Sequence, residues 1–332
     1  MNQEIILKSR PKGKPANSDF EINEIDEPQL KNGEVLLETQ YISVDPYLRG
    51  RMRDQKSYVE QFKLNEPLSS ALVVKVLESK NDSLKEGDYL TGMLPWKKRQ
   101  VSDATELRKV EEGEVPLSAY LGILGMTGLT AYFGLIHIGE PKKGETIVVS
   151  GAAGAVGSTV GQIAKIKGLK TIGIAGSEEK IEMIKSQFGY DVGINYKTTT
   201  DMNKAIKEAA PNGVDVYYDN VGGEVSDGVL ANINQFARVI NCGAISLYND
   251  TETPTGPRVE PLLIKNSAKM QGFIVSNYEN QFDEGIKQLA SWLKEGKLKF
   301  EETFVDGFEN TPQAFIDLFD GKNKGKMVVR MK

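Results

Sequence analysis

The stretch Thr146-Ile-Val-Val-Ser-Gly151-Ala-Ala-Gly154-Ala-Val-Gly157 decides the fold that we expect for this chain. Its first residues form a short apolar run, which is typical of a strand buried on both faces. Glycines follow, and apolar residues then continue at helical spacing over 156–167. Glycines between a strand and a helix permit a tight turn and a close approach to a pyrophosphate, which the helix N-terminus attracts. The stretch therefore predicts a Rossmann-type unit that binds a dinucleotide, with a ligand-free glycine turn as the alternative.

Strands and helices alternate on the C-terminal side of this stretch. We expect a helix over 178–188, with Ser177 as its N-cap. Short apolar runs predict further strands over 171–175, 192–194, 214–218, 237–240 and 270–274. This alternation predicts a parallel sheet covered by helices on both faces, which is an α/β fold.

The N-terminal third has a different pattern. Strand-like runs occupy 35–39 and 71–77, and turn residues lie between them. No long helical period occurs before Pro116, whereas the apolar and small residues of 117–136 predict one or two buried helices. The first part of the chain is therefore expected to be a β-rich domain.

The length of 332 residues is too great for one ordinary core and predicts two domains. We expect the final strand, over 326–330, to return to the β-rich part. The predicted organisation is a β-rich substrate domain over 1–118, completed by about 300–332, and a dinucleotide-binding domain over 119–299.

Composition argues against several classes of function. The net charge of −5 is spread along the chain, unlike the basic surface of a nucleic-acid-binding protein. No apolar run reaches transmembrane length and the first one is too short for a signal peptide, so we expect a cytoplasmic protein without membrane contact. A catalytic zinc usually takes three protein ligands. The chain has one cysteine, Cys242, and one histidine, His137, which we interpret as structural, so no metal site is expected.

One short basic cluster, Lys97-Lys98-Arg99, stands out in the β-rich part. Short charge clusters are commonly solvated loops. The alternative is a basic lip that attracts an anionic substrate.

The end of the second strand of the dinucleotide unit bears on the cofactor. An NAD site usually has an acidic residue about 20 residues beyond the glycines, bound to the ribose 2′-hydroxyl. Here that position is Gly176, which leaves room for a 2′-phosphate. Ser177 can donate a hydrogen bond and Lys180 can supply positive charge, so the sequence favours NADP(H). Glu178 and Glu179 would repel a phosphate if they pointed inward.

Polar and glycine residues also follow two later strands, over 219–223 and 241–248. Ligands of open α/β sheets bind at the carboxyl ends of the strands. We therefore expect both segments to line the cofactor site, although either could be an ordinary turn.

Read in order, ten segments of the chain resemble the zinc-independent branch of the medium-chain dehydrogenase/reductase superfamily. Within it, the chain is similar to the prostaglandin reductase, leukotriene dehydrogenase and NADP-dependent alkenal double-bond reductase group. The resemblance spans nearly the whole chain. It is carried by residues 43–49, 125–132, 152–157, 176–180, 195–197, 219–223, 242–246, 272–275, 307–310 and 321–326.

The resemblance implies a GroES-like β domain beside a Rossmann domain, a homodimer, and NADPH-dependent reduction of a carbon–carbon double bond conjugated to a carbonyl. It implies that Lys180 contacts the 2′-phosphate, and that Tyr196 packs near the adenosine. The pyrophosphate would lie on Gly154, Ala155, Val156 and Gly157. The nicotinamide half would be lined by Asn220, Cys242, Gly243, Ala244, Ile245, Ser246, Tyr248, Phe273, Ile274, Val275 and Asn323, and the substrate would face Tyr47 and Tyr248.

The chain departs from the family pattern at 67–70 and at 97–99, both in the β domain, so substrate identity stays open. In the implied reaction, charge builds on the carbonyl oxygen of an enolate, and only hydrogen-bond donors can stabilise it without a metal. Candidates include the Tyr248 hydroxyl, while the α-carbon proton comes from Tyr248 or water. Two other functions stay open: a quinone reductase of the same superfamily, and a non-catalytic NADPH-binding redox sensor.

Overall fold

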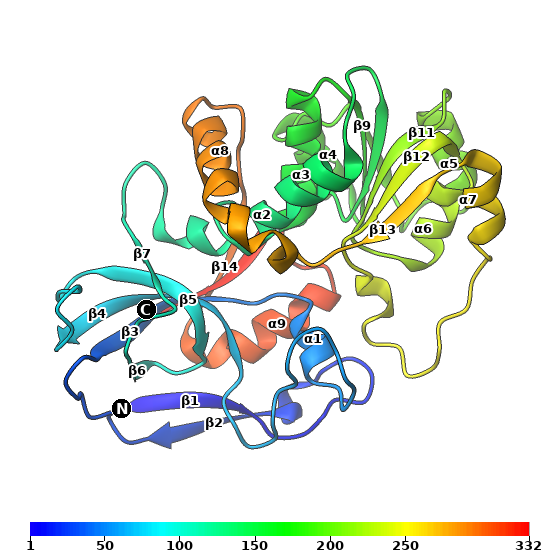
Figure 1. Cartoon of the computed structure of the whole chain (residues 1–332). Helices are drawn as coiled ribbons and strands as arrows, with labels where there is room; N and C mark the ends of the chain where they lie inside the picture. Colours follow the sequence, from blue (N-terminus) through cyan, green and yellow to red (C-terminus); the bar gives the residue numbers. More distant parts are fainter. Residues whose placement is uncertain (332) are drawn as a thin grey trace. The chain divides into compact units, whose positions relative to one another are not determined.

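The computed structural model describes residues 1–331. The chain divides into two compact units (Figure 1). The first unit holds residues 1–121, 302–323 and the chain from 327 onward. The second holds residues 122–301 together with the short segment 324–326.

The first unit is built on a seven-stranded sheet, in which β15 lies between β14 and β3. Val328 of β15 is paired with Ser43 of β3, so the end of the chain lies beside a strand from its first fifty residues. The buried core under this sheet includes Trp96 and Phe315. The strands of the sheet are β3 (Val35–Ser43), β4 (Ser69–Ser79), β5 (Tyr89–Pro95), β6 (Arg99–Ser102), β7 (Arg108–Val110), β14 (Glu302–Asp306) and β15 (Lys326–Arg330).

A separate antiparallel pair and two helices complete the first unit. The pair is β1 (Asn2–Leu7) and β2 (Phe20–Ile25). The helices are the single turn α1 (Leu48–Arg51) and α9 (Thr311–Phe319). Phe315 of α9 packs edge-on against Phe20 of β2, with ring centroids 6.4 Å apart.

The second unit is built on a six-stranded sheet with the strand order β10-β9-β8-β11-β12-β13. Every neighbouring pair is parallel. The predicted α/β fold class is therefore confirmed. The chain reverses its direction of winding between β8 and β11, and such a switch point is where open α/β sheets bind ligands. The strands are β8 (Thr146–Ser150), β9 (Lys170–Ala175), β10 (Val192–Asn195), β11 (Val214–Asp219), β12 (Ile233–Asn241) and β13 (Lys269–Gly272).

Helices flank this sheet, with α3 and α4 on one side and α5 and α6 on the other (Figure 1). β8 is buried at all five of its residues, as expected for a central strand covered on both faces. The helices that alternate with the strands are α3 (Ala155–Ile166), α4 (Glu178–Ser186), α5 (Met202–Ala209), α6 (Gly223–Leu230) and α7 (Glu260–Asn266).

The region over 117–136 forms a 3₁₀ turn (Leu117–Leu121), then α2 (Met126–Phe133), which continues as a π-helical turn (Gly134–Gly139). α2 packs against α3 and against α8 (Phe282–Lys294). Phe133 stacks on Tyr278 with ring centroids 5.0 Å apart, and His137 lies 5.1 Å from Tyr278. His137 thus lies in an aromatic cluster, in line with its structural interpretation.

Several element boundaries differ from the sequence expectation, and in the second unit three of them differ by two residues or more. α4 ends at Ser186, two residues early, before the turn at Gly189 with φ of +72°. β12 begins at Ile233, four residues earlier than expected. Its first residues are largely polar, so the sequence did not indicate a strand there, although they pair with β11 through a register shift. β13 ends at Gly272, and two residues later the Ile274 N–H donates to the Asn277 side chain at 3.0 Å instead of to a neighbouring strand.

Candidate nucleotide site at the carboxyl ends of the parallel strands

The loop between β8 and α3 has a shape that only small residues allow. Gly154 is the N-cap of α3 in an extended conformation, and its N–H donates to the Gly151 carbonyl at 3.0 Å. A Cβ on Gly157 would overlap the Gly151 carbonyl oxygen and lie 2.8 Å from the Ala152 Cα. Glycine at 157 therefore lets α3 begin directly against the end of β8. The first-turn N–H groups of this twelve-residue helix have no partner within the helix and can bind an anion.

A segment from the far end of the chain completes this loop. The Gly325 N–H donates to the Ala153 carbonyl at 2.8 Å, and Gly325 forms a parallel bridge with Gly154. A Cβ on Gly325 would overlap the carbonyl of Glu301. The sequence interpretation named Asn323 in this segment through the resemblance but missed the pairing itself. The glycine at 325 was the only local signal of a close backbone approach.

The space beside Gly176, at the end of β9, is occupied by the ring of Tyr196. A Cβ on Gly176 would lie 2.9 Å from a carbon of that ring. Tyr196 follows β10, its N–H donates to the Ala175 carbonyl at 3.1 Å, and its side chain is 43% exposed. The glycine thus makes room for an aromatic ring, which can present a face to an adenine, rather than open space for a phosphate.

The first turn of α4 gathers charged groups. Ser177 is the N-cap, as predicted, and its hydroxyl oxygen accepts from the Lys180 N–H at 3.2 Å. The Glu178 carboxylate accepts from the Asn195 side chain at 2.6 Å. Glu179 is ion-paired with Lys324. Both glutamates that could have repelled a phosphate therefore have partners within the second unit.

Lys180 lies in a region of concentrated positive charge. Burial lowers the pKa of the Lys180 ammonium below its usual value, and Lys197 and Lys324 lower it further. The Glu179 carboxylate acts in the opposite direction. The neighbouring ammonium groups disfavour the charged form of Lys180, so a bound anion would be favourable there.

The end of β11 is held by one carboxylate. Asp219 is 4% exposed, and a single oxygen of its side chain accepts four hydrogen bonds. Two come from side-chain hydroxyls, of Ser150 on β8 and of Tyr217, each at 2.8 Å. The other two come from the N–H groups of Val221 and Gly222, each at 3.0 Å. Asp219 therefore sets the path of the 219–223 segment.

Asn220 ties this segment back to β8. Its N–H donates to the Ser150 hydroxyl at 2.9 Å, and its side-chain amide donates to the Ser150 carbonyl at 2.8 Å. The next predicted segment, after β12, is held against it by backbone bonds. The N–H groups of Cys242 and Gly243 donate to the Asp219 carbonyl at 2.9 and 3.1 Å, and the Ser246 hydroxyl donates to the Val221 carbonyl at 2.6 Å. The two predicted segments thus form one network.

The chemistry of Cys242 is bounded by its surroundings. Burial raises the pKa of the Cys242 thiol to about 12, although a hydrogen bond with Tyr218 acts in the opposite direction. Tyr218 itself donates to the Thr130 carbonyl at 2.7 Å. Reactive and redox-sensing cysteines have lowered pKa values, so Cys242 has the character of an inert thiol at neutral pH.

Tyr248 follows the short 3₁₀ turn Ile245–Leu247. Its hydroxyl oxygen accepts a hydrogen bond from the Ala244 N–H at 3.3 Å. Burial raises the pKa of the Tyr248 phenol, and the bond from Ala244 acts in the opposite direction. The phenol is therefore protonated at neutral pH and has the chemistry of a hydrogen-bond donor.

Residues 273–275 lie beyond the end of β13 rather than in it. The Phe273 ring packs edge-on against Tyr278 with centroids 6.4 Å apart, and a Cβ on Gly134 would lie 2.7 Å from it. Ile274 and Val275 lead into a 3₁₀ segment, Val275–Gln281. The resemblance placed these three residues in the site, and the structure shows them following the carboxyl end of a sheet strand.

Tyr47 belongs to the first unit. It follows Asp45, whose carboxylate accepts from the Ser43 hydroxyl, and it immediately precedes α1. Burial raises the pKa of the Tyr47 phenol, Asp45 raises it further, and Arg51 opposes both through charge and a hydrogen bond. Tyr47 is thus fixed within the β-rich unit.

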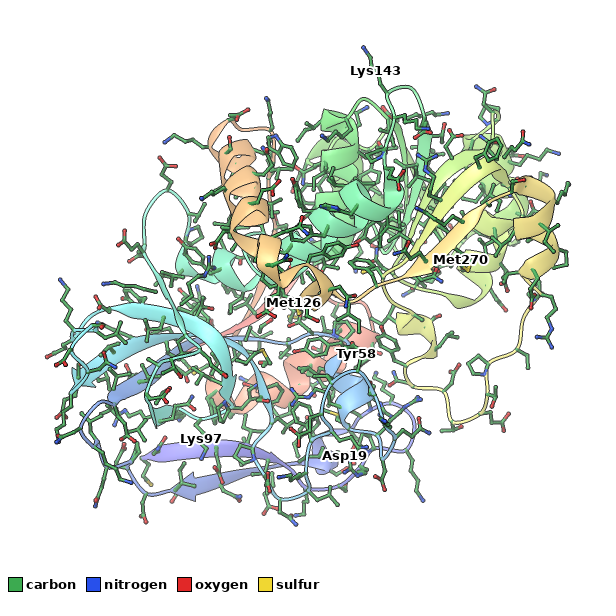
Figure 2. All side chains as sticks on the ribbon, in the orientation of Figure 1. Asp19, Tyr58, Lys97, Met126, Lys143 and Met270 are labelled. Atoms are coloured by element: carbon green, nitrogen blue, oxygen red, sulfur yellow. The ribbon has the colours of Figure 1, made fainter. Side chains whose placement is uncertain are left out.

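The basic cluster at 97–99 does not form a free cationic lip. Lys97, labelled in Figure 2, pairs with Glu4 of β1 at 3.0 Å. Arg99 pairs with Glu27 at 3.1 Å and with Glu38 of β3 at 3.4 Å. The Lys98 ammonium lies 5.6 Å from the centre of the Phe308 ring. The alternative of a basic lip is therefore wrong, because the fold places carboxylates opposite two of the three charges.

Over residues 1–331, no group of three or more His, Cys, Asp or Glu side chains is arranged to hold a metal ion. Within the same residues, the length and hydropathy needed for a membrane-spanning helix are not met anywhere.

Comparison with known proteins gives the family. Residues 3–110 match the family model described as N-terminal domain of oxidoreductase, and residues 155–291 match the one described as Zinc-binding dehydrogenase. The chain is 56% identical to YfmJ of Bacillus subtilis over 331 residues, covering 99% of this chain and 97% of that protein. The chain belongs to the medium-chain dehydrogenase/reductase family. The resemblance in sequence to its zinc-independent reductase branch is thereby confirmed.

Two further members of this family bear on the site. The 2-alkenal reductase (NADP⁺-dependent) of Nicotiana tabacum is 41% identical over 334 residues, covering 99% of this chain and 97% of that protein. The crystal structure of CurA from Vibrio vulnificus in complex with NADPH superposes with a TM-score of 0.94 and 41% identity, covering 99% of both chains. CurA therefore shares the fold of the whole chain, and not only that of the dinucleotide unit.

Proposed function

We propose that this chain is an NADPH-dependent reductase of the carbon–carbon double bond in α,β-unsaturated aldehydes and ketones. The observation that carries the proposal is made at the end of β9. Gly176 stands there in place of the acidic residue that would favour NAD. The first turn of α4 instead presents Lys180 in a cluster of positive charge. Two relatives support the same conclusion: the NADP⁺-dependent 2-alkenal reductase of Nicotiana tabacum, and CurA of Vibrio vulnificus in its complex with NADPH.

The residues present fit such a cofactor. The pyrophosphate would lie on Gly154, Ala155, Val156 and Gly157, where the first-turn N–H groups of the last three point out of the end of α3. Lys180 would hold the 2′-phosphate and Tyr196 the adenosine. We assign the nicotinamide half to the network after β11 and β12, to residues 273–275 and to Asn323, as the resemblance implies.

The bound cofactor supplies the hydride for the β-carbon of the substrate. The role that we assign to Tyr248 is to donate a hydrogen bond to the carbonyl oxygen as negative charge develops on it. The raised pKa keeps the Tyr248 proton in place at neutral pH, but it also makes the phenol a weak acid. We therefore assign the α-carbon proton to water and the orientation of the carbonyl to Tyr248.

The reaction that we propose needs no zinc. The chain has one histidine and one cysteine, and within the described residues neither belongs to a group of three or more His, Cys, Asp or Glu side chains that could hold a metal. Conjugate addition spreads charge over an enolate, which hydrogen-bond donors can stabilise, whereas direct reduction of a carbonyl concentrates charge on one oxygen. Activity that survives a strong chelator is the expected result, and a tightly bound, activity-dependent zinc would contradict this step.

A panel of enals, enones and quinones, each assayed with NADPH and with NADH, tests the proposed function. We expect turnover of enals and enones with a strong preference for NADPH. Turnover of quinones alone would favour the related quinone reductase activity instead. NADPH binding without turnover of any compound would favour a sensor, although the pKa of about 12 for Cys242 argues against sensing through its thiol.

We also propose that the protein is a cytoplasmic homodimer that acts on a small molecule. The cytoplasmic location is supported by the single cysteine, and the dimer by the family resemblance. Light scattering coupled to gel filtration tests the dimer, and cell fractionation tests the location.

A further inference from the structure

The first turn of α4 holds Glu178, Glu179 and Lys180. The charges that act on the Lys180 ammonium are those of Lys197, Lys324 and Glu179. Lys197 and Lys324 both lower the pKa of Lys180, and Glu179 alone acts against them. The Glu178 carboxylate is occupied by the Asn195 side chain at 2.6 Å. Around Lys180 the positive charges therefore outnumber the negative ones, and a phosphate monoester, which carries about two negative charges, would offset that excess.

Lys324 reaches this cluster from a distant part of the sequence. Its neighbour Gly325 is anchored to the phosphate loop, because the Gly325 N–H donates to the Ala153 carbonyl at 2.8 Å. The Lys324 side chain then extends to Glu179 on α4. It thus bridges the two segments of the second unit that follow β8 and β9, which are the segments we assign to the pyrophosphate and to the adenosine ribose.

The ion pair between Lys324 and Glu179 is easy to exchange. The Glu179 side chain is 70% exposed and that of Lys324 is 39% exposed. Exposed ion pairs contribute little to stability, because water stabilises the two separated charges nearly as well as the ion pair does. A phosphate with more charge and more acceptor oxygens competes effectively for the same ammonium.

We propose that Lys324 is a second determinant of 2′-phosphate recognition, which exchanges its partner Glu179 for the phosphate when the nucleotide binds. This inference rests on the proposed NADPH-dependent function. It adds a cation that comes from the C-terminal segment rather than from the β9–α4 turn, and it gives Glu179 the role of holding that cation ready.

Binding of two small nucleotides by calorimetry tests the inference without turnover. Adenosine 2′,5′-bisphosphate carries the 2′-phosphate and ADP lacks it, so ADP reports on the fold and on the rest of the site. The variants are Lys324→Met, Lys180→Met, Glu179→Gln and the matched control Lys322→Met. Lys322 lies two residues away in the same segment, is 57% exposed and pairs with Asp317 at 2.9 Å.

We expect Lys324→Met to weaken binding of adenosine 2′,5′-bisphosphate about 10-fold while binding of ADP stays within about 2-fold. Lys322→Met should leave both affinities unchanged. Glu179→Gln should tighten the bisphosphate by about 2- to 5-fold, because the ion pair no longer has to be broken.

Equal effects of Lys324→Met and Lys322→Met, or equal losses for both ligands in Lys324→Met, would overturn the role of Lys324. Unchanged or weaker bisphosphate binding in Glu179→Gln would overturn the proposed exchange of Glu179 for the phosphate. Lys324 would then bind the phosphate without first being held by Glu179. A wild-type protein without preference for the bisphosphate, or a Lys180→Met variant that keeps this preference, would instead refute the proposed NADPH specificity.

Discussion

Replacing Asp219 by alanine should loosen the nucleotide site more than any other single change in the β11 segment. One oxygen of this buried carboxylate accepts hydrogen bonds from Ser150, Tyr217, Val221 and Gly222 at 2.8 to 3.0 Å. The substitution leaves the hydroxyl of Tyr217, a residue that is 0% exposed, and two loop N–H groups without their acceptor. The 219–223 segment then loses the group that sets its path.

The magnitude follows from those lost partners. Leaving one buried donor unsatisfied costs about 1–3 kcal/mol, and such costs do not add fully, so we expect a loss on the order of 4 kcal/mol. A unit of this size loses about 2–4 °C in melting temperature per kcal/mol, which gives a midpoint lowered by about 8–16 °C. We also expect roughly 10-fold weaker binding of NADPH, because the disordered segment must be ordered again on binding.

Asp215 offers a matched control on the same strand. It lies at the amino end of β11, where it accepts from the Thr146 N–H and from the Asn234 side chain, each at 2.8 Å. Asp215→Ala should lower the melting temperature of the protein but leave its NADPH affinity unchanged. Both affinities are measured by NADPH fluorescence well below the melting range. If Asp219→Ala bound NADPH no more weakly than Asp215→Ala, Asp219 would not organise the site.

Four further predictions address three residues. Lys180→Met should weaken NADPH by about 10- to 150-fold while NADH use barely changes, since a hydrogen bond to a charged group is worth about 1.5–3 kcal/mol; equal losses for both cofactors would refute the phosphate role. Tyr248→Phe should lower turnover by roughly 10- to 1,000-fold, a larger effect than on NADPH affinity. Because the Tyr248 pKa is raised, the wild-type rate should show no loss of a phenol proton as the pH rises to the usual tyrosine value of about 10. Cys242, whose pKa is about 12, should react slowly with a thiol reagent at pH 8 and rapidly after unfolding; fast labelling of the native protein would contradict the raised pKa.

Local patterns in the sequence were enough to predict the dinucleotide unit. The apolar run of β8 and the glycine at 157 are features of one short stretch, and they follow directly from burial on two faces and a close backbone approach. The N-cap role of Ser177 is local in the same way. The carboxyl end of β11 was also predictable, because the polar residues of 219–223 directly follow a buried strand.

Contacts between distant residues were not predictable. The ion pair of Lys324 with Glu179 joins residues 145 positions apart, and nothing in either local sequence indicates it. The position of Tyr196 against Gly176 depends on the pairing of β9 with β10. The pairing of Lys97 with Glu4 likewise depends on the bridge between these two residues, so a cluster that is basic in sequence is neutralised in the fold.

Analysis of the product formed from a simple 2-alkenal tests the central claim most directly. The substrate is incubated with NADPH that carries deuterium at the transferable position, and the product is identified by NMR and mass spectrometry. The proposed mechanism predicts a saturated aldehyde with deuterium on the β-carbon and the carbonyl intact. An allylic alcohol with deuterium on the former carbonyl carbon would contradict the mechanism, whatever the cofactor preference.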